Sequence, residues 1–279
     1  VRGGQQHGLD FLDAVRANGA AAVVWEPPCR LPLPADDGQW PQLAVPGLRQ
    51  KLGHIASRFY GDPSQSVQVV GITGTDGKTS CAHYIAQALS QAETGPCGLL
   101  GTLGGGVYGA VEPGLHTTPD PIRVQGWLTG LAAAGRRYAV MEVSSHALDQ
   151  GRVNGVAFAV AVLTQLSRDH LDYHRTVTAY AAAKRRLFVD QAPPRSVLNL
   201  DDAFGQTLAV DPAVRARIIG YGLGKRPIGL ERWVWGKNLR LTPDGLHLAI
   251  ESSWGTGELE TGLLGRFNAH NLLAALATL

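Results

Sequence analysis

At residues 71–80 the chain reads GITGTDGKTS, and this stretch decides how the rest of the sequence is interpreted. It follows the apolar run Val67-Gln-Val-Val70, which is typical of a buried strand, and it precedes residues 80–89, which favour a helix. A glycine-rich turn between a strand and a helix presents backbone N–H groups and the positive end of the helix dipole to an anion. The stretch therefore predicts a site for phosphate groups.

The match to the phosphate-loop pattern is partial. That pattern is a glycine, four further residues and then Gly-Lys-Ser/Thr. Gly77, Lys78 and Thr79 satisfy its end, but Ile72 stands where its first glycine belongs. Gly74 still permits a sharp turn, and Gly77 lets the backbone approach an anion closely. An ordinary strand–turn–helix connection is the alternative, and the Lys-Thr pair at the first helical turn makes it the weaker one.

The composition is that of a globular α/β protein. The 279 residues are 44% hydrophobic and 17% charged, and the net charge of +2 favours neither a nucleic-acid partner nor a membrane surface. No apolar stretch approaches the roughly 20 residues of a membrane span, and no signal peptide is visible. Cys29, Cys81 and Cys97 lack the paired spacing of a metal site. We therefore expect reduced thiols, a cytoplasmic location and small-molecule partners, with the oligomeric state left open.

Two segments with different patterns divide the chain. Residues 1–63 combine short helical and strand patterns with a proline-rich loop and predict a small, partial α/β domain. Residues 64–279 predict a larger domain, and Gly61-Asp-Pro-Ser-Gln-Ser66 is the candidate linker. The chain begins without Met in a loop-like stretch and ends within the helical run 271–279, so we expect a fragment that lacks sequence at both ends.

The larger segment alternates strands and helices. Buried strands are expected at 97–102, 138–143, 158–164 and 196–199, with helices at 121–134 and 177–189. Strands that are apolar on both faces and separated by helices predict an α/β fold with a doubly wound, mostly parallel sheet of phosphate-loop type. Residues 228–264 alternate apolar and polar positions and predict a small antiparallel section. Ligands bind such sheets at the carboxyl ends of the strands, where the polar clusters of this sequence fall.

Several polar residues near these strand ends suit metal and phosphate chemistry. Lys78 could neutralise phosphate oxygens, the Thr79 hydroxyl could ligate Mg²⁺, and Glu142 could supply a carboxylate ligand. Glu142 could equally be a surface residue at a strand end. Asp169-His-Leu-Asp-Tyr-His174 is dense in metal-capable groups, but it lacks the pattern of a zinc protease, and a polar loop is the alternative. Lys184 shares a helix face with Tyr180, and a solvated charge is its usual interpretation.

Taken together, these stretches resemble the Mur ligases of peptidoglycan synthesis, in family order and over residues 64–279. The stretches that carry the resemblance are Gly71-Ile-Thr-Gly-Thr-Asp-Gly-Lys-Thr-Ser80, His116-Thr-Thr-Pro-Asp120, Met141-Glu-Val-Ser-Ser-His-Ala-Leu-Asp-Gln-Gly-Arg152, Leu166-Ser-Arg-Asp-His-Leu-Asp-Tyr-His174, Tyr180-Ala-Ala-Ala-Lys184 and Gly265-Arg-Phe-Asn-Ala-His-Asn271. The third and fourth of them resemble the branch of the family that adds the third residue of the stem peptide. This family has a shorter Gly-Thr-x-Gly-Lys-Thr/Ser loop, so Ile72 is no objection.

The resemblance implies ATP and Mg²⁺ as cofactors of a central ATP-binding domain. The ATP-binding positions would be Gly74, Thr75, Asp76, Gly77, Lys78, Thr79, Ser80, Asn268 and Asn271. The metal positions would be Thr79, Glu142, His170 and Lys184, and the catalytic residues Lys78, Lys184 and His170. Lys184 would carry a carbamate from CO₂, which replaces its positive charge with an anion that can ligate or orient a second Mg²⁺.

The resemblance also implies a substrate and a reaction. Positions that match those holding UDP-MurNAc-dipeptide are Gln5, His116, Thr117, Thr118, Ser144, Gln150 and Arg152. Asn is common in the family where His116 stands, and Gln5 would belong to a UDP-sugar site within residues 1–63. The dipeptide carboxylate would take the γ-phosphate of ATP to form an acyl phosphate, which the amino group of the incoming amino acid then attacks. Lys78 and Mg²⁺ would offset the negative charge that accumulates.

Meso-diaminopimelate is favoured over L-lysine as the incoming amino acid because it is the commoner bacterial case. The family's amino-acid-binding domain would follow Leu279, so we expect these 279 residues alone not to turn over. The alternatives are a sister Mur ligase, folylpolyglutamate synthetase, and a nucleotide-binding paralogue without catalysis. Lys78, Glu142, His170 and Lys184 together argue against lost catalysis. A phosphate-loop kinase or GTPase would need a Walker-B aspartate and no histidine at the metal.

Overall fold

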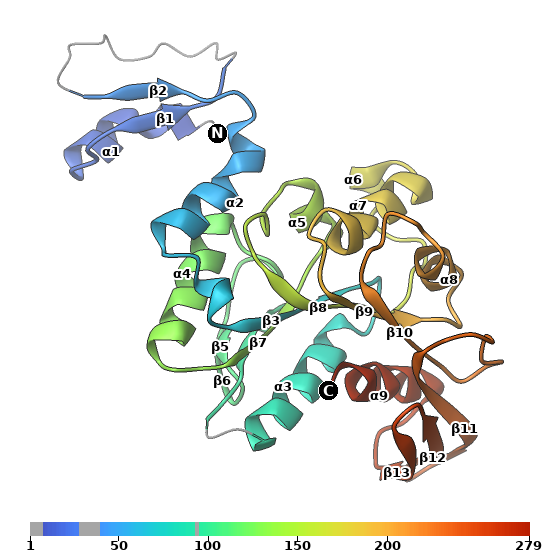
Figure 1. Ribbon diagram of the computed structural model, residues 1–279. Helices are drawn as coiled ribbons and strands as arrows, with labels where there is room; N and C mark the ends of the chain where they lie inside the picture. Colours follow the sequence, from blue (N-terminus) through green and yellow to red (C-terminus); the bar gives the residue numbers. More distant parts are fainter. Residues whose placement is uncertain (1–7, 28–39, 93–94) are drawn as a thin grey trace.

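The computed structural model describes residues 8–27, 40–92 and 95–279 (Figure 1). Gln5 and Cys29 therefore lie outside the described residues. No helix within these described ranges has the length and apolar character needed to cross a membrane.

A single mixed sheet forms the centre of the molecule, with strand order β13-β12-β11-β10-β9-β8-β3-β7-β4-β5-β6. Its parallel part comprises β3 (Gln68–Thr73), β4 (Gly98–Gly101), β7 (Tyr138–Glu142), β8 (Phe158–Leu163), β9 (Arg195–Asn199), β10 (Arg217–Gly222) and β11 (Arg232–Thr242). Antiparallel strands extend both edges: β12 (Gly245–Ser252) and β13 (Gly255–Thr261) on one side, β5 (Gly104–Val107) and β6 (Ala110–Glu112) on the other.

Helices cover both faces of this sheet (Figure 1). α3 (Lys78–Ala92) and α9 (Arg266–Thr278) pack on one face. α4 (Pro121–Ala133), α5 (Ser145–Asp149), α7 (Val177–Val189) and α8 (Ala203–Ala209) pack on the other, and the short α6 (Leu171–His174) lies against α7. Four of these helices begin at an acidic or hydroxyl cap whose side chain accepts from the first-turn N–H groups: Asp120, Ser144, Thr176 and Asp202.

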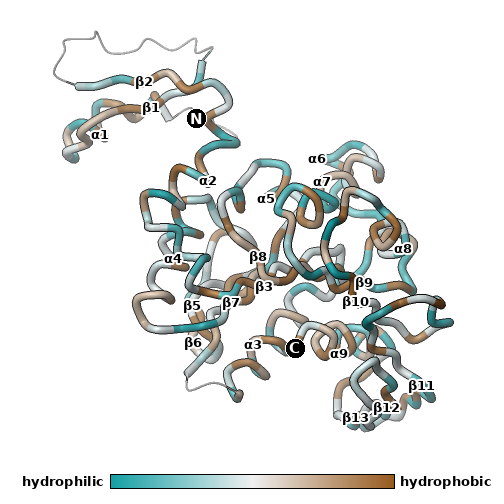
Figure 2. Tube along the Cα trace, viewed as in Figure 1, coloured by the Kyte–Doolittle hydropathy of each residue, from teal (hydrophilic) through white to brown (hydrophobic). Residues whose placement is uncertain are grey.

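Alternation along the buried strands creates two hydrophobic cores. Val70 and Ile72 of β3 point towards α3 and α9, whereas Val69 points towards α4 and α7. Figure 2 shows apolar residues concentrated along β3, β7 and β8. β3 lies between β7 and β8 and is parallel to both, so the βα units that follow β3 in the chain add strands on both sides of it. The carboxyl end of β3 is therefore a topological switch point, the usual place for a ligand in such sheets.

The first part of the chain is built separately. The 3₁₀ turn η1 (Gly8–Phe11), α1 (Leu12–Ala17) and a two-stranded parallel sheet of β1 (Val23–Trp25) and β2 (Gln42–Ala44) stand apart from the main sheet (Figure 1). α2 (Leu48–Phe59) leads from them and packs against α4, and η2 (Pro63–Gln65) precedes β3. The domain boundary near residue 64 stays a prediction, although η2 falls at that position.

The predicted α/β class with a doubly wound, mostly parallel sheet is confirmed. The predicted helix 177–189 coincides with α7, and the antiparallel section at 228–264 corresponds to β11, β12 and β13. This section continues the main sheet, because β11 pairs in parallel with β10 before it pairs with β12. The sequence did not predict β5 and β6, since Gly104, Gly105 and Gly106 remove the side-chain alternation that marks a strand.

Candidate functional site

The loop between β3 and α3 needs its two glycines. Gly74 has φ of +148° and Gly77 has φ of +81°, in the region that L side chains rarely adopt. A Cβ on Gly74 would collide with Thr164 Oγ1, and one on Gly77 would collide with Asn271 Oδ1. The loop is therefore pressed between the end of β8 and helix α9. Beyond it, the first turn of α3 leaves N–H groups without helical partners, as every helix does.

Lys78 folds back over this loop from the first position of α3. Its Nζ donates to Gly74 O at 3.0 Å and to Thr75 O at 2.6 Å. Burial lowers the pKa of Lys78, while the carboxylates of Glu142, Asp76 and Asp169 act in the opposite direction. The ammonium group thus lies at the loop, beside the free N–H groups of the helix start, where an anion would meet both.

Glu142 is buried at the end of β7 and reaches the same helix start. Its Oε1 accepts from Thr79 Oγ1 at 2.9 Å and from Thr102 N at 2.8 Å, and its Oε2 accepts from Thr102 Oγ1 at 3.1 Å. A Cβ on Gly101 would collide with Oε1. The interpretation of Glu142 as a surface residue at a strand end is therefore wrong: the strands β4 and β7 hold its carboxylate against Thr79.

Lys184 is almost completely buried, which is rare for a lysine: only 1% of its surface is exposed. It reaches the loop from α7, and its Nζ donates to Gly74 O at 2.7 Å, the same oxygen that Lys78 uses. Nζ also lies 4.5 Å from the centre of the Tyr180 ring. Burial, and secondly the charge of Lys78, hold the pKa of Lys184 well below its usual value. The interpretation of Lys184 as a solvated charge is wrong.

His170 lies in an aromatic cluster next to Lys184. Its ring centre is 6.0 Å from that of Tyr180 and 5.0 Å from that of His146. The Tyr180 hydroxyl lies 3.2 Å from Thr75 Oγ1, which ties the cluster to the phosphate loop. His174 is buried and its Nε2 lies 3.0 Å from Ser145 Oγ. His170 itself is exposed and has a positive φ of 50°, so its ring stands at the open side of the cluster.

The donor set suits Mg²⁺ better than zinc. Among the described residues, no three His, Cys, Asp or Glu side chains are grouped so that they could hold a metal ion. Mg²⁺ does not need such a group, because it usually binds one or two carboxylates together with substrate phosphates and waters. A buried carboxylate in contact with a hydroxyl at a phosphate loop, as in Glu142 and Thr79, fits that requirement.

Hydrogen bonds connect most of the expected substrate residues at the ends of β4 and β7, where Thr118 is fully buried. Thr117 Oγ1 lies 3.2 Å from Thr102 Oγ1, and Thr118 Oγ1 donates to the backbone carbonyl of Glu142 at 2.8 Å. Ser144 N donates to Thr118 Oγ1 at 3.1 Å. Arg152 donates to Thr118 O at 2.7 Å and to Gln150 Oε1 at 3.0 and 2.7 Å. His116 is exposed at the start of this segment.

The two asparagines approach the loop from the other face of the sheet. Asn271 on α9 accepts from Cys81 Sγ at 3.6 Å, and its side chain is the group that a Cβ on Gly77 would strike. Asn268 Oδ1 accepts from Tyr84 OH at 3.3 Å. Asp76 is exposed at the loop and accepts from Gln165 Nε2 at 2.7 Å, and Ser80 is partly exposed in the first turn of α3.

Sequence reasoning missed Thr102 and Thr164. Thr102 donates twice to Glu142, and Thr164 Oγ1 donates to Asp76 O at 2.6 Å and faces Gly74. Both follow buried parallel strands directly, so a search of every strand end for polar residues would have found them. A cavity of about 840 Å³ lies elsewhere, at the amino ends of the strands near Gln68, Tyr138 and the end of α9, and none of the expected residues lines it.

Comparisons with known proteins give the family. A family model described as Mur ligase middle domain matches residues 72–279. The chain is 48% identical over 283 residues to the UDP-N-acetylmuramoyl-L-alanyl-D-glutamate–2,6-diaminopimelate ligase of Alkalilimnicola ehrlichii, covering 99% of this chain and 56% of that protein. It is 46% identical over 279 residues to the ligase of the same name from Pseudomonas aeruginosa, covering 100% of this chain and 56% of the relative.

A solved structure agrees with these relatives. The structure titled as a UDP-N-acetylmuramoyl-L-alanyl-D-glutamate–2,6-diaminopimelate ligase superimposes with a TM-score of 0.81 at 34% identity, over 96% of this chain and 53% of that one. The chain thus spans about half the length of the curated relatives it matches. On the family match over residues 72–279, the chain belongs to the Mur ligase family.

Proposed function

We propose that this chain supplies the ATP-binding part of a ligase that adds meso-diaminopimelate to UDP-N-acetylmuramoyl-L-alanyl-D-glutamate, in the cytoplasmic part of peptidoglycan synthesis. One observation carries the proposal: Lys78, Lys184 and the Thr79–Glu142 pair converge on a single loop at the switch point of the sheet. The names of the two relatives supply the substrate and the amino acid.

The residues at the loop would bind and orient the triphosphate of ATP. The N–H groups of the first turn of α3 and the Lys78 ammonium donate to phosphate oxygens. Lys78 gives up its bonds to Gly74 O and Thr75 O to do so, and Gly74 O keeps the bond from Lys184. Asn268 and Asn271 would contact adenine. Thr79, Glu142 and His170 would hold Mg²⁺, which when bound supplies positive charge against the phosphate oxygens.

Lys184 would carry a carbamate. An uncharged amine adds CO₂ to give a carbamate and a proton, and burial favours the uncharged form of this amine. The product is an anion that Lys78 and a divalent cation would stabilise, and its oxygens would serve as a metal ligand in place of an ammonium group. Tyr180 and Gly74 O fix the position of the side chain.

The surface around Thr117, Thr118, Ser144 and Arg152 would hold the dipeptide end of the UDP-linked substrate, with His116 and Gln150 at its border. It adjoins Glu142, so the carboxylate to be activated would lie next to the metal site. Residues 1–63 would belong to a UDP-sugar-binding domain, and the proposed Gln5 contact falls outside the described residues. Residues 64–279 would form the ATP-binding domain.

The test uses the whole protein that contains this chain. We expect phosphate release from ATP only when UDP-N-acetylmuramoyl-L-alanyl-D-glutamate and the amino acid are both present, with meso-diaminopimelate preferred over L-lysine. Lys184→Ala should abolish the reaction, and a short carboxylic acid should restore part of it by replacing the carbamate. Arg185→Ala is the control that keeps full activity, because Arg185 is the next residue along α7, is partly exposed and pairs with Asp211 instead of the loop. An unmodified protein that binds ATP but never releases phosphate would be a paralogue without catalysis.

A further inference from the structure

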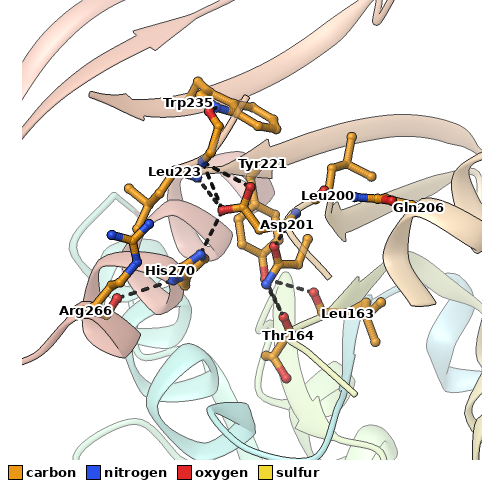
Figure 3. A network of polar contacts seen from close by, with 12 residues as sticks. Leu163, Thr164, Leu200, Asp201, Gln206, Tyr221, Leu223, Trp235, Arg266 and His270 are labelled. Atoms are coloured by element: carbon orange, nitrogen blue, oxygen red, sulfur yellow. Dashed lines mark hydrogen bonds and ion pairs between the residues drawn. The ribbon is translucent and has the colours of Figure 1, made fainter. Parts of the chain in front are cut away.

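Asp201 is the centre of a polar network beside the nucleotide-binding face (Figure 3). It follows β9 and accepts from Leu223 N at 2.6 Å and from Gly224 N at 3.0 Å, just after β10. Gly224 O in turn accepts from Trp235 Nε1 of β11 at 2.7 Å. A Cβ on Gly224 would lie 2.7 Å from Asp201 Oδ1, so the carboxylate fits closely against the backbone. Asp201 thereby joins three neighbouring strands.

His270 connects α9 to this network. Its Nε2 lies 3.0 Å from Asp201 Oδ2, and its Nδ1 lies 3.3 Å from Arg266 O (Figure 3). Both partners are oxygen acceptors, so each contact is a hydrogen bond when the ring nitrogen facing it carries a proton. In the tautomer with a proton on Nε2, the His270 ring donates to Asp201 Oδ2 and ties α9 to the ends of the strands. Hydrogen bonds from His270, Leu223 N and Gly224 N, acting against burial, lower the pKa of the Asp201 carboxyl.

The start of α9 depends on such side-chain contacts. Its cap position is Gly265, and no side chain caps the first-turn N–H groups. Helix ends without a cap are less stable than capped ones. His270 sits between Asn268 and Asn271 in sequence, but it points to the strands, whereas the two asparagines contact Cys81 and Tyr84 of α3. The start of α9 is thus held on one side by the contact of His270 with Asp201 at the sheet, and on the other by the contacts of the two asparagines with α3.

We infer that Asp201 and His270 are positioning residues for the nucleotide: they fix the first turns of α9 so that Asn268 and Asn271 face adenine beside the phosphate loop. The inference rests on the proposed nucleotide site and extends it to a pair that does not itself touch the ligand. Loss of the pair leaves α9 folded by its apolar face, with Leu273 and Ala274 in the core, but lets its first turns vary. The fraction of molecules that are competent to bind then falls, and the apparent dissociation constant rises in proportion.

The experiment measures MgADP binding to the whole protein that contains this chain by calorimetry, with thermal unfolding recorded for each variant. His270→Leu removes both ring nitrogens, and His270→Gln keeps an amide donor for Asp201. We expect the dissociation constant to rise about fivefold to tenfold for His270→Leu and to stay within about twofold for His270→Gln. The control is His247→Leu on β12, which removes another histidine–acid contact, 3.6 Å from Glu260, and should not change binding.

Amide hydrogen exchange gives a second readout that does not need a ligand. In His270→Leu, exchange should accelerate in residues 266–271 and remain slow in the core residues of α9. A folded His270→Leu that binds MgADP as the unmodified chain does would overturn the inference, as would equal weakening by His270→Gln. If His270→Leu does not fold, Asp201→Asn is measured in its place. An unchanged affinity of Asp201→Asn for MgADP would also overturn the inference. If the unmodified whole protein binds no MgADP, the proposed function fails first and the inference with it.

Discussion

Replacing Lys184 by methionine should separate the function of this residue from its place in the fold. Methionine has nearly the same length and volume, so the buried space along α7 stays filled. The variant removes the hydrogen bond to Gly74 O and the contact with the Tyr180 ring. It does not leave Gly74 O without a partner, because Lys78 still donates to that oxygen at 3.0 Å.

The expected change in the free energy of unfolding is small. One hydrogen bond contributes about 1 kcal/mol net, and the Tyr180 contact contributes roughly as much when the amine is charged. Burial of the amine works in the opposite direction, since it holds the pKa of Lys184 well below its usual value and so disfavours the charged form. We expect a net change within about 1 kcal/mol, which shifts the melting temperature by less than about 4 °C.

The assay compares thermal unfolding of Lys184→Met with that of Leu187→Ala, a fully buried residue one turn along the same helix. Leu187→Ala leaves a cavity and should cost about 2–5 kcal/mol. In the whole protein, Lys184→Met should abolish phosphate release although the fold persists. A loss of stability as large as that of Leu187→Ala would show that the amine is required for folding. Full activity would show that it has no catalytic role.

Three further predictions concern single features of the structure. Gly77→Ala should lower the free energy of unfolding by more than Gly109→Ala does in denaturant titrations. Both glycines have a positive φ, which costs an alanine about 1–2 kcal/mol. Of the two, only Gly77 also faces a side chain, that of Asn271, which an added Cβ would strike. Burial raises the pKa of Cys81 and of Cys97 to about 12, so mass spectrometry should find neither thiol alkylated at neutral pH until the chain unfolds; early labelling would contradict this. The pKa of the Asp201 carboxyl is lowered in the folded chain, so its contribution to stability is present at neutral pH and is lost as pH falls through the folded pKa. Asp201→Asn should therefore lose less stability between about pH 5 and pH 3 in acid titrations, and parallel curves would refute the assignment.

Much of the fold follows from local patterns. Strands buried on both faces are long apolar runs, and α7 is bounded by the Thr176 cap and by the end of its apolar stripe, so both were predictable. The glycine-rich β5 and the short helices α5 and α6 were not, because their conformations depend on the partners they meet in the folded chain. Strand order was equally out of reach, since it is a property of pairing between distant segments.

The candidate site likewise has a part that local sequence predicts and a part that depends on contacts between distant segments. Lys78 and Thr79 were predicted as site residues because phosphate binding needs glycines, a lysine and a hydroxyl next to one another in the chain. The burial of Glu142 and Lys184 could not be predicted from the residues alone, because a surface position and a buried one have the same local sequence. Contacts such as Thr102 with Glu142, 40 positions apart, exist only after the strands pair.

The carbonyl oxygen of Gly74 accepts hydrogen bonds from two lysine amines. Lys78 reaches it from a helix start that remains partly open to solvent, whereas Lys184 reaches it from inside the protein. An arriving anion can draw the Lys78 amine away without leaving Gly74 O unpaired, since the Lys184 amine still donates to it. Because both lysines share this one backbone acceptor, Lys78 can move to the ligand while Lys184 continues to hold the loop in place.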